Sequence, residues 1–253
     1  MLRDQLRRVV WRLTCMHPGR GSVVVALLGM NIVLVPGMWQ SGSVWEAVAA
    51  RLMRSGHRVT TLTLPGQGDG NLSASLEDQV DAVVAVVDAA PGGAVVVGHS
   101  AAATLAWMAA DRRPEAVRSV VLVGGFPEAD GALYFFAFAP VDGVVPFPGW
   151  EPFEGADAAD LEEEQRAGFA ERAVSVPEAV THGIVKLTDR RRYEVPVVLV
   201  RPEFTPAEAQ EWIVGTELAA SASVELVDID SGHWPMITRP VELADVLAEV
   251  ADR

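Results

Sequence analysis

The sequence is poor in cysteine and lysine and has no long apolar run. Cys15 is the only cysteine, which excludes an internal disulfide and favours a reducing compartment, so we expect a cytoplasmic protein. Of the 20 basic residues, Lys186 alone is a lysine, and this bias toward arginine, with abundant alanine and valine, suggests a GC-rich bacterial genome. Every uninterrupted apolar stretch falls short of the roughly 18 residues that a membrane span needs. We therefore expect no membrane insertion.

Positively charged residues are also scarce. The chain has 20 basic and 34 acidic residues, so its formal net charge is −14. Such a surface repels nucleic acids and anionic membranes, so we expect neither as a partner and favour a small-molecule substrate. With 253 residues, 50% of them hydrophobic, the chain can bury one sizeable core and form one domain. A homodimer is compatible with this composition, and the oligomeric state stays open.

The first 29 residues differ from the rest because they are basic. They hold five arginines and one acid, Asp4, and a buried strand could begin directly after Met30, a candidate start residue. We expect residues 1–29 to be an N-terminal extension, disordered or outside the native fold. A twin-arginine export signal at Arg7-Arg8 is disfavoured, since the apolar run at 23–28 is short and lacks a small-residue cleavage site.

Six short apolar runs alternate with amphipathic stretches. The runs are continuous, as in parallel strands buried on both faces. The predicted strands are 32–35, 59–64, 94–98, 119–123, 197–200 and 224–227. The predicted helices are 44–55, 76–89, 101–112, 205–219 and 240–251. This alternation predicts an α/β fold with a doubly wound, mostly parallel six-stranded sheet.

One interval between predicted strands is much longer than the others. We predict a core formed by 30–125 and 195–253, interrupted after the fourth strand by an insertion at 126–194. Part of this insertion is aromatic and rich in proline, and residues 157–172 read as an acidic helix. A segment of this kind is typical of a helical cap over a pocket. The alternative is a helical excursion that packs on the sheet edge for stability alone.

The third predicted strand runs into Gly98-His99-Ser100-Ala101-Ala102, after which a helix begins. A serine at such a bend projects its hydroxyl away from the sheet, and the amides at the helix start face a developing oxyanion. We therefore predict Ser100 as a nucleophile. Taken alone, a serine in a strand-to-helix turn is more often a helix cap, and Ala102 replaces the last glycine of the usual Gly-x-Ser-x-Gly pattern.

The first predicted strand ends in Val35-Pro36-Gly37-Met38-Trp39. A loop here would lie beside the serine bend, so we assign the backbone amides of Met38 and Ala101 to an oxyanion hole. A Pro-Gly turn without a function is the simpler reading of the dipeptide by itself.

A histidine follows the last predicted strand, within Asp230-Ser231-Gly232-His233-Trp234. An imidazole at this edge of the sheet could take the proton of Ser100 and return it to a leaving group. We predict His233 as the general base. His99 is placed in the pocket wall, and the other histidines, His17, His57 and His182, are expected to be structural or solvated.

The order of these motifs resembles the α/β-hydrolase superfamily over residues 30–253. The start Leu34-Val35-Pro36-Gly37-Met38-Trp39 resembles a compact branch with plant-type methyl esterases, hydroxynitrile lyases and actinobacterial hydrolases. This resemblance implies attack by serine on an ester or a related carbonyl, without a metal or an organic cofactor. Members with lyase activity carry a lysine after the histidine. Trp234 stands there in this chain, which disfavours cyanohydrin cleavage.

The acid of the triad is where the chain departs from that resemblance. Thr205 occupies the usual position of the aspartate, so Glu203 in the same loop is the first choice to orient His233. Glu128 and Asp130, after the fourth predicted strand, are the alternatives. Each of the three could equally be a solvated loop carboxylate.

The sequence thus favours hydrolysis of a carboxylic ester of a small, largely apolar substrate through an acyl-enzyme. The expected pocket residues are Trp39, His99, Phe126, Tyr134, Phe135 and Trp234. A lyase, cyclase or acyl-transfer enzyme of bacterial secondary metabolism is the alternative on the same fold. A non-catalytic binding protein is a third reading, and it would require Ser100 and His233 to be relics.

Overall fold

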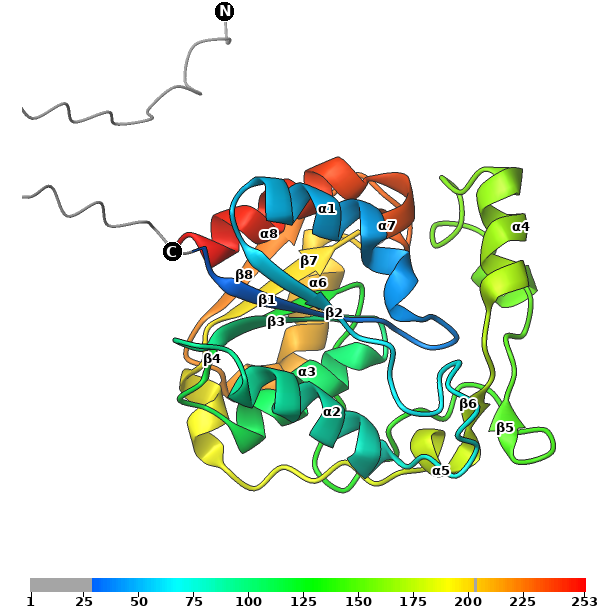
Figure 1. Cartoon of the computed structure of the whole chain (residues 1–253), viewed down its shortest axis with the longest axis horizontal. Coiled ribbons are helices and arrows are strands. Elements are labelled where there is room, and N and C mark those ends of the chain that lie inside the picture. The colour runs from blue at the N-terminus through cyan, green and yellow to red at the C-terminus, as the bar shows by residue number, and fades with distance from the viewer. Residues whose placement is uncertain (1–28, 203) are drawn as a thin grey trace, which may run out of the picture.

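The predicted runs form one six-stranded sheet in a computed structural model that describes residues 29–202 and 204–253 (Figure 1). All neighbouring strands are parallel, in the order β2-β1-β3-β4-β7-β8. The strands are β1 (Asn31–Val35), β2 (Arg58–Thr61), β3 (Ala94–His99), β4 (Val117–Val123), β7 (Val197–Arg201) and β8 (Val224–Asp228). The doubly wound α/β prediction is confirmed.

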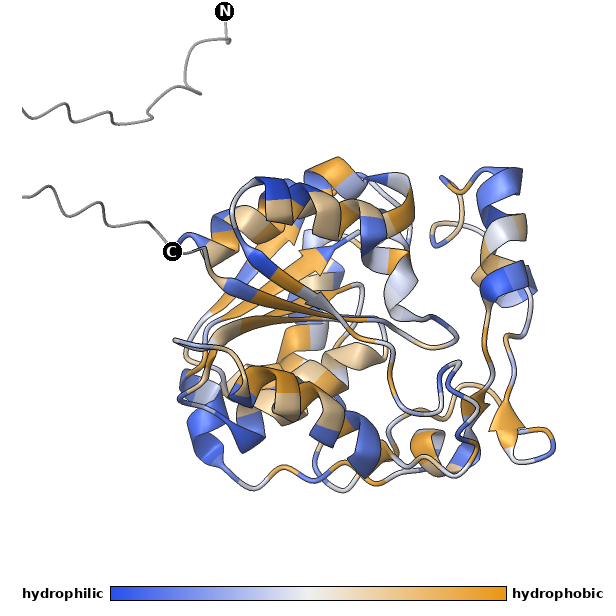
Figure 2. Ribbon diagram, viewed as in Figure 1, coloured by the Kyte–Doolittle hydropathy of each residue, from blue (hydrophilic) through white to orange (hydrophobic). Residues whose placement is uncertain are grey.

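Side chains of the inner strands alternate between two apolar cores, one on each face of the sheet. In β1, Val33 and Val35 face one core while Ile32 and Leu34 face the other. The inner strands are coloured as hydrophobic in Figure 2, whereas β2 at the edge is more polar. The second strand is also shorter than predicted, because after the Leu62 amide bonds to Leu34 O the chain turns away from β1.

Helices cover both faces of the sheet. The core on one face contains side chains of α2 (Leu76–Asp88), α3 (Ala102–Arg112) and α6 (Pro206–Gly215). The core on the other face contains side chains of α1 (Glu46–Arg54), α7 (Pro235–Thr238) and α8 (Pro240–Ala251). A 3-10 turn, η1 (Gly42–Trp45), leads into α1.

Local sequence explains where these helices begin and end. Helix α2 starts with a capping box, because Ser75 Oγ accepts from the amide of Asp78 and the Asp78 carboxylate accepts from the Ser75 amide. The predicted helix 205–219 is divided into α6 and a 3-10 helix, η4 (Glu217–Ala220). Gly215 is a poor helix former, and Thr216 caps the new helix by accepting from Leu218 N.

Most of the inserted segment, residues 126–194, lies on the side to which the parallel strands point, and its last residues return to the opposite side before β7 (Figure 1). It contains α4 (Glu163–Arg172), the helical turn α5 (Glu178–Thr181), and the 3-10 helices η2 (Glu151–Phe153) and η3 (Arg190–Glu194). Helix α4 starts later than predicted, because Glu162 forms an N-terminal capping box with Gln165 and residues 157–161 form a turn. A two-stranded antiparallel sheet of β5 (Val144–Val145) and β6 (Val176–Pro177) was not predicted, since two-residue strands leave no periodic pattern.

Within residues 29–202 and 204–253, every helix is too short or too polar to cross a membrane. The expectations for residues 1–28 and for Glu203 concern positions outside the described residues.

Candidate active site

Ser100 lies at a sharp bend between β3 and α3. Its φ is +53°, a left-handed conformation that is costly for any residue with a side chain. The Ser100 amide donates to Val123 O at 2.9 Å, and its carbonyl accepts from Ala103 N at 2.9 Å. The bend is therefore fixed by β4 on one side and by the first turn of α3 on the other, while Ser100 itself is only half-buried.

Two glycines make room for this bend. A Cβ at Gly98 would lie 2.2 Å from Ala102 O, and one at Gly125 would lie 2.4 Å from Ser100 O. Gly98 belongs to the motif found in the sequence, whereas Gly125 is brought to the serine by the pairing of β3 with β4. The role of Gly125 was not predicted, because a glycine after a strand has many explanations.

The loop after β1 packs directly on the serine bend. The pairing of Val35 with Gly98 aligns the ends of β1 and β3. A Cβ at Gly37 would lie 3.2 Å from the Ser100 Cβ, and Trp39 adopts a φ of +63° as the chain turns away. Met38 is buried, and Ala101 follows the serine at the start of α3. The two expected oxyanion donors thus belong to segments that flank Ser100.

His233 reaches the same edge of the sheet although β8 is three strands away from β3. Its carbonyl accepts from His99 Nε2 at 2.8 Å, and its amide donates to Asp157 O at 2.7 Å in the inserted segment. Gly232 fits closely beneath the inserted segment, because a Cβ there would lie 2.3 Å from Asp157 O. The His233 loop is therefore held between the serine bend and the inserted segment.

His99 connects the serine bend to the His233 loop. Its side chain is fully buried, and its ring centroid lies 4.9 Å from that of His233. Burial lowers the pKa of His99 well below the usual value, with a smaller contribution from the neighbouring His233. His99 is therefore neutral near pH 7, and Nε2 must carry the proton because its partner is a carbonyl. His99, expected in the pocket wall, thus forms a buried bridge between the two loops.

Aromatic side chains of the inserted segment surround two of the expected pocket residues. Rings of the inserted segment contact Trp39 at centroid distances of 5.5 to 6.0 Å; they are Phe135, Phe138, Phe147 and Phe153. Trp234 is packed similarly against Trp150, Phe153 and Phe169. Trp39 and Trp234 are themselves 5% and 2% exposed, so their rings mainly join the inserted segment to the core.

Two other expected pocket residues lie elsewhere in the packing. Tyr134 is buried in the core, and burial raises the pKa of its hydroxyl. Phe126 packs against Phe204 and Trp212 near α6, tilted to the first ring and edge-on to the second. Phe135, by contrast, is half-buried and lies against Trp39.

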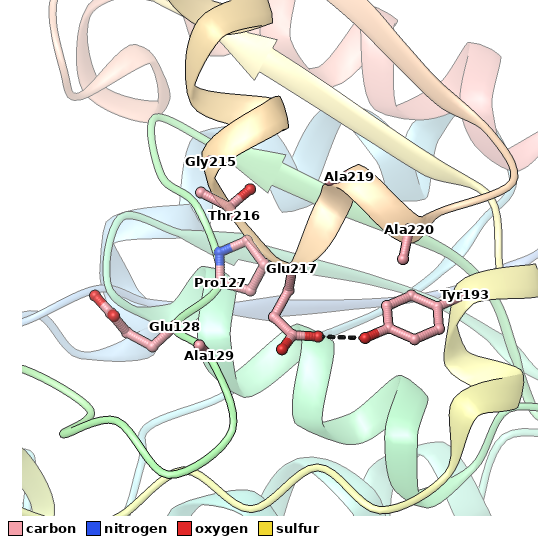
Figure 3. Close-up of a pocket in the computed structure, with 9 residues that line it drawn as sticks. All are labelled: Pro127, Glu128, Ala129, Tyr193, Gly215, Thr216, Glu217, Ala219 and Ala220. Atoms are coloured by element: carbon pink, nitrogen blue, oxygen red, sulfur yellow. Dashed lines mark hydrogen bonds between the residues drawn. The ribbon is translucent and has the colours of Figure 1, made fainter.

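The alternative acids Glu128 and Asp130 differ in their exposure and in their contacts. Asp130 is exposed, and its carboxylate accepts from the Leu187 amide at 2.8 Å. Glu128 lines an open hollow of about 410 Å³, where burial raises the pKa of its carboxyl. In Figure 3 the Glu128 carboxyl points away from the Glu217 carboxylate, which accepts from the Tyr193 hydroxyl at 2.6 Å.

Metal-ligand side chains do not gather anywhere in the described part of the chain, where no three His, Cys, Asp or Glu residues form a group that could hold an ion.

Comparison with known proteins gives a family and several relatives. The model of the alpha/beta hydrolase family matches residues 32–246. A carbendazim hydrolyzing esterase of Nocardioides sp. (strain SG-4G) is 34% identical over 106 residues, 40% of this chain and 44% of the esterase. The aligned part thus spans less than half of that esterase. Methylesterase 7 of Arabidopsis thaliana is 25% identical over 254 residues, which cover 88% of this chain and 96% of that protein.

Solved structures share the fold at low sequence identity. An extracellular α/β-hydrolase from a Paenibacillus species has a TM-score of 0.72 and 18% identity, covering 88% of this chain and all of that one. A pyrethroid hydrolase from Sphingobium faniae has a TM-score of 0.68 and 21% identity, covering 88% of this chain and 97% of that one. At such identities the likeness concerns the fold.

Proposed function

Because the chain belongs to the α/β-hydrolase family, we propose that it is a serine hydrolase that cleaves a carboxylic ester of a small, largely apolar substrate. The observation that carries this proposal is the strained, half-exposed conformation of Ser100, at φ +53°, beside the Gly37 turn and the His99–His233 contact. Strain in a non-glycine residue persists where the surroundings enforce it, and it is concentrated at functional sites.

The proposed reaction has two steps through an acyl-enzyme. Ser100 Oγ attacks the ester carbonyl carbon while its proton passes to the His233 ring. The bond to the alcohol then breaks, and the alcohol leaves with the proton from His233. A water molecule attacks the acyl-enzyme, gives its proton to His233, and releases the acid, after which His233 returns the proton to Ser100.

In this mechanism the backbone amides of Met38 and Ala101 donate to the oxygen that becomes negative during attack. Donors of this kind act in a site shielded from water and typically account for a factor of about 10² to 10³ in kcat each. Glu203 remains our first choice as the acid that orients His233, with Glu128 and Asp130 as alternatives. A carboxylate beside the imidazole would hold the ring in the required tautomer.

The aromatic inserted segment is proposed to act as the cap that shapes the acyl and alcohol pockets. Phe135 and Phe138 are half-buried next to Trp39, so an apolar substrate that enters there would meet aromatic surfaces. The relatives named as an esterase and a methylesterase support an ester as the substrate class.

The test compares the wild-type protein with Ser100→Ala on a panel of short-chain p-nitrophenyl esters. We expect the substitution to lower kcat by about 10⁴-fold or more, because the nucleophile and its base act as a unit. Intact mass after fluorophosphonate treatment should show one adduct on the wild type and none on Ser100→Ala. Equal turnover by the two proteins would refute the proposal. Labelling of Ser100 without ester turnover would favour the lyase, cyclase or acyl-transfer alternative.

A further inference from the structure

The side-chain amide of Gln67 lies against the loop that is expected to supply one oxyanion donor. Gln67 is 2% exposed, and its Nε2 donates to Gly37 O at 3.1 Å. A carbonyl oxygen can only accept, so the nitrogen of the side-chain amide must face it. A buried polar side chain thus makes its hydrogen bond to the turn that packs on Ser100.

The geometry of the peptide group gives this bond a consequence at the catalytic serine. The carbonyl of Gly37 and the amide of Met38 belong to one planar peptide unit and point in opposite directions. A donor that fixes the carbonyl therefore fixes the direction of the Met38 N–H as well. The same bond polarises the peptide unit, which strengthens the N–H as a donor.

Gln67 is itself held in place by a tight turn. It lies between Gly66 at φ +80° and Gly68 at φ +100°, and its amide donates to Leu64 O at 2.9 Å. Asp69 Oδ1 accepts from the Gly66 amide at 3.0 Å. On the outer side, a Cβ at Gly66 would lie 2.7 Å from Pro177 Cγ, so the inserted segment packs against this turn. The turn therefore holds the side-chain amide of Gln67 in place before any substrate binds.

We propose that Gln67 is a positioning residue for the oxyanion hole, holding the Gly37–Met38 peptide so that the Met38 amide points at the substrate oxygen. This inference rests on the proposed function and extends it to a residue 33 positions away from Ser100 in the sequence. Because the oxyanion exists only during reaction, losing the Gln67 donor should weaken binding of the transition state and leave substrate binding nearly unchanged.

The test uses Gln67→Met, which keeps the length of the side chain and removes the donor. The matched control is Gln79→Met, because Gln79 is also buried and donates to Pro65 O at 2.9 Å, in the same loop but away from Gly37. We expect Gln67→Met to lower kcat for p-nitrophenyl butyrate by about 10- to 100-fold, somewhat less than complete loss of a donor. KM should change by less than about threefold, and Gln79→Met should keep both constants within that range.

A second measurement separates positioning from loss of structure. Affinity for a trifluoromethyl ketone, which forms a tetrahedral adduct with serine, should fall with Gln67→Met by the same factor as kcat. Thermal unfolding of both variants reports structural damage independently. Gln67→Leu, which also lacks a donor for Gly37 O, should reproduce the loss of kcat if the methionine variant does not fold.

The outcomes distinguish this inference from the function on which it rests. Wild-type kcat and inhibitor affinity in Gln67→Met, or equal losses in Gln67→Met and Gln79→Met, would overturn the role of Gln67 while the esterase proposal stands. A wild-type protein without ester turnover and without fluorophosphonate labelling would overturn both.

Discussion

The bridge between His99 and the His233 loop gives a prediction whose size follows from the structure. His99→Leu keeps a side chain of similar bulk in the fully buried site and removes the bond from Nε2 to His233 O. A buried carbonyl left without its donor costs about 1 to 3 kcal/mol, so the free energy of unfolding should fall by that amount. His99→Gln is the control, because its amide can still donate to His233 O.

Activity should respond to His99→Leu as well. His233 would lose the backbone attachment of its loop to His99, while the bond to Asp157 O remains. A misplacement of about 1 Å can cost about 100-fold in rate, so we expect kcat to fall by roughly tenfold or more, with a smaller loss in His99→Gln. Steady-state kinetics on a p-nitrophenyl ester measures this loss.

The pH dependence of stability tests the same site independently. The pKa of His99 is lowered in the folded state by burial, so the unfolded state binds the proton that the folded state excludes. Stability should therefore fall as the pH drops below about 6.5, by at most about 1.4 kcal/mol per pH unit. His99→Leu and His99→Gln lack this contribution and should lose less stability between pH 7.5 and 5.5 in urea unfolding. The reasoning fails if wild type and both variants show the same pH dependence, or if His99→Leu keeps wild-type stability and kcat.

Two further predictions concern close packing and buried charge. Gly125→Ala should abolish fluorophosphonate labelling, because its Cβ would lie 2.4 Å from Ser100 O, whereas Gly215→Ala, with open space around its Cβ, should label normally. Arg192→Met should lower the free energy of unfolding by about 3 to 5 kcal/mol, since the guanidinium pairs with the buried Asp111 at 3.1 Å. Arg191→Met removes exposed ion pairs and should change the free energy of unfolding far less than Arg192→Met in the same assay.

Much of the fold follows from local sequence patterns. Apolar runs identified all six strands of the main sheet, most clearly the inner strands, because burial on both faces leaves few polar positions there. The apolar pattern predicted helix boundaries less well where a capping residue started a helix at another position. Thr216 begins a new helix inside a stretch that looked continuous, and Glu162 delays the start of α4.

Part of the candidate site could also be predicted from local sequence patterns. Ser100 and its flanking glycine lie within one short motif, and the positions of Met38 and His233 follow from their places after the first and last strands. The sequence ranked Glu203 ahead of Glu128 and Asp130 as the expected acid but could not decide among them, because each follows a predicted strand. Tyr134 and Phe126 were expected in the pocket, but the sequence could not show that Tyr134 is buried and that Phe126 packs against Phe204, since an aromatic residue in an insertion has the same pattern whether it lines a pocket or packs in a core.

The sequence by itself determined the strands, their alternation with helices, and the bend that carries Ser100, because each depends on residues within a few positions of one another. The tertiary structure alone decided which distant residues meet. Gln67 bonds to Gly37, and His99 bonds to a residue 134 positions away, because the sheet order places their loops at one edge. The periodicity of hydrophobic residues indicates which side chains are buried, but it does not indicate which residues contact each other. Contacts between distant residues are therefore decided only by the packing of the whole chain.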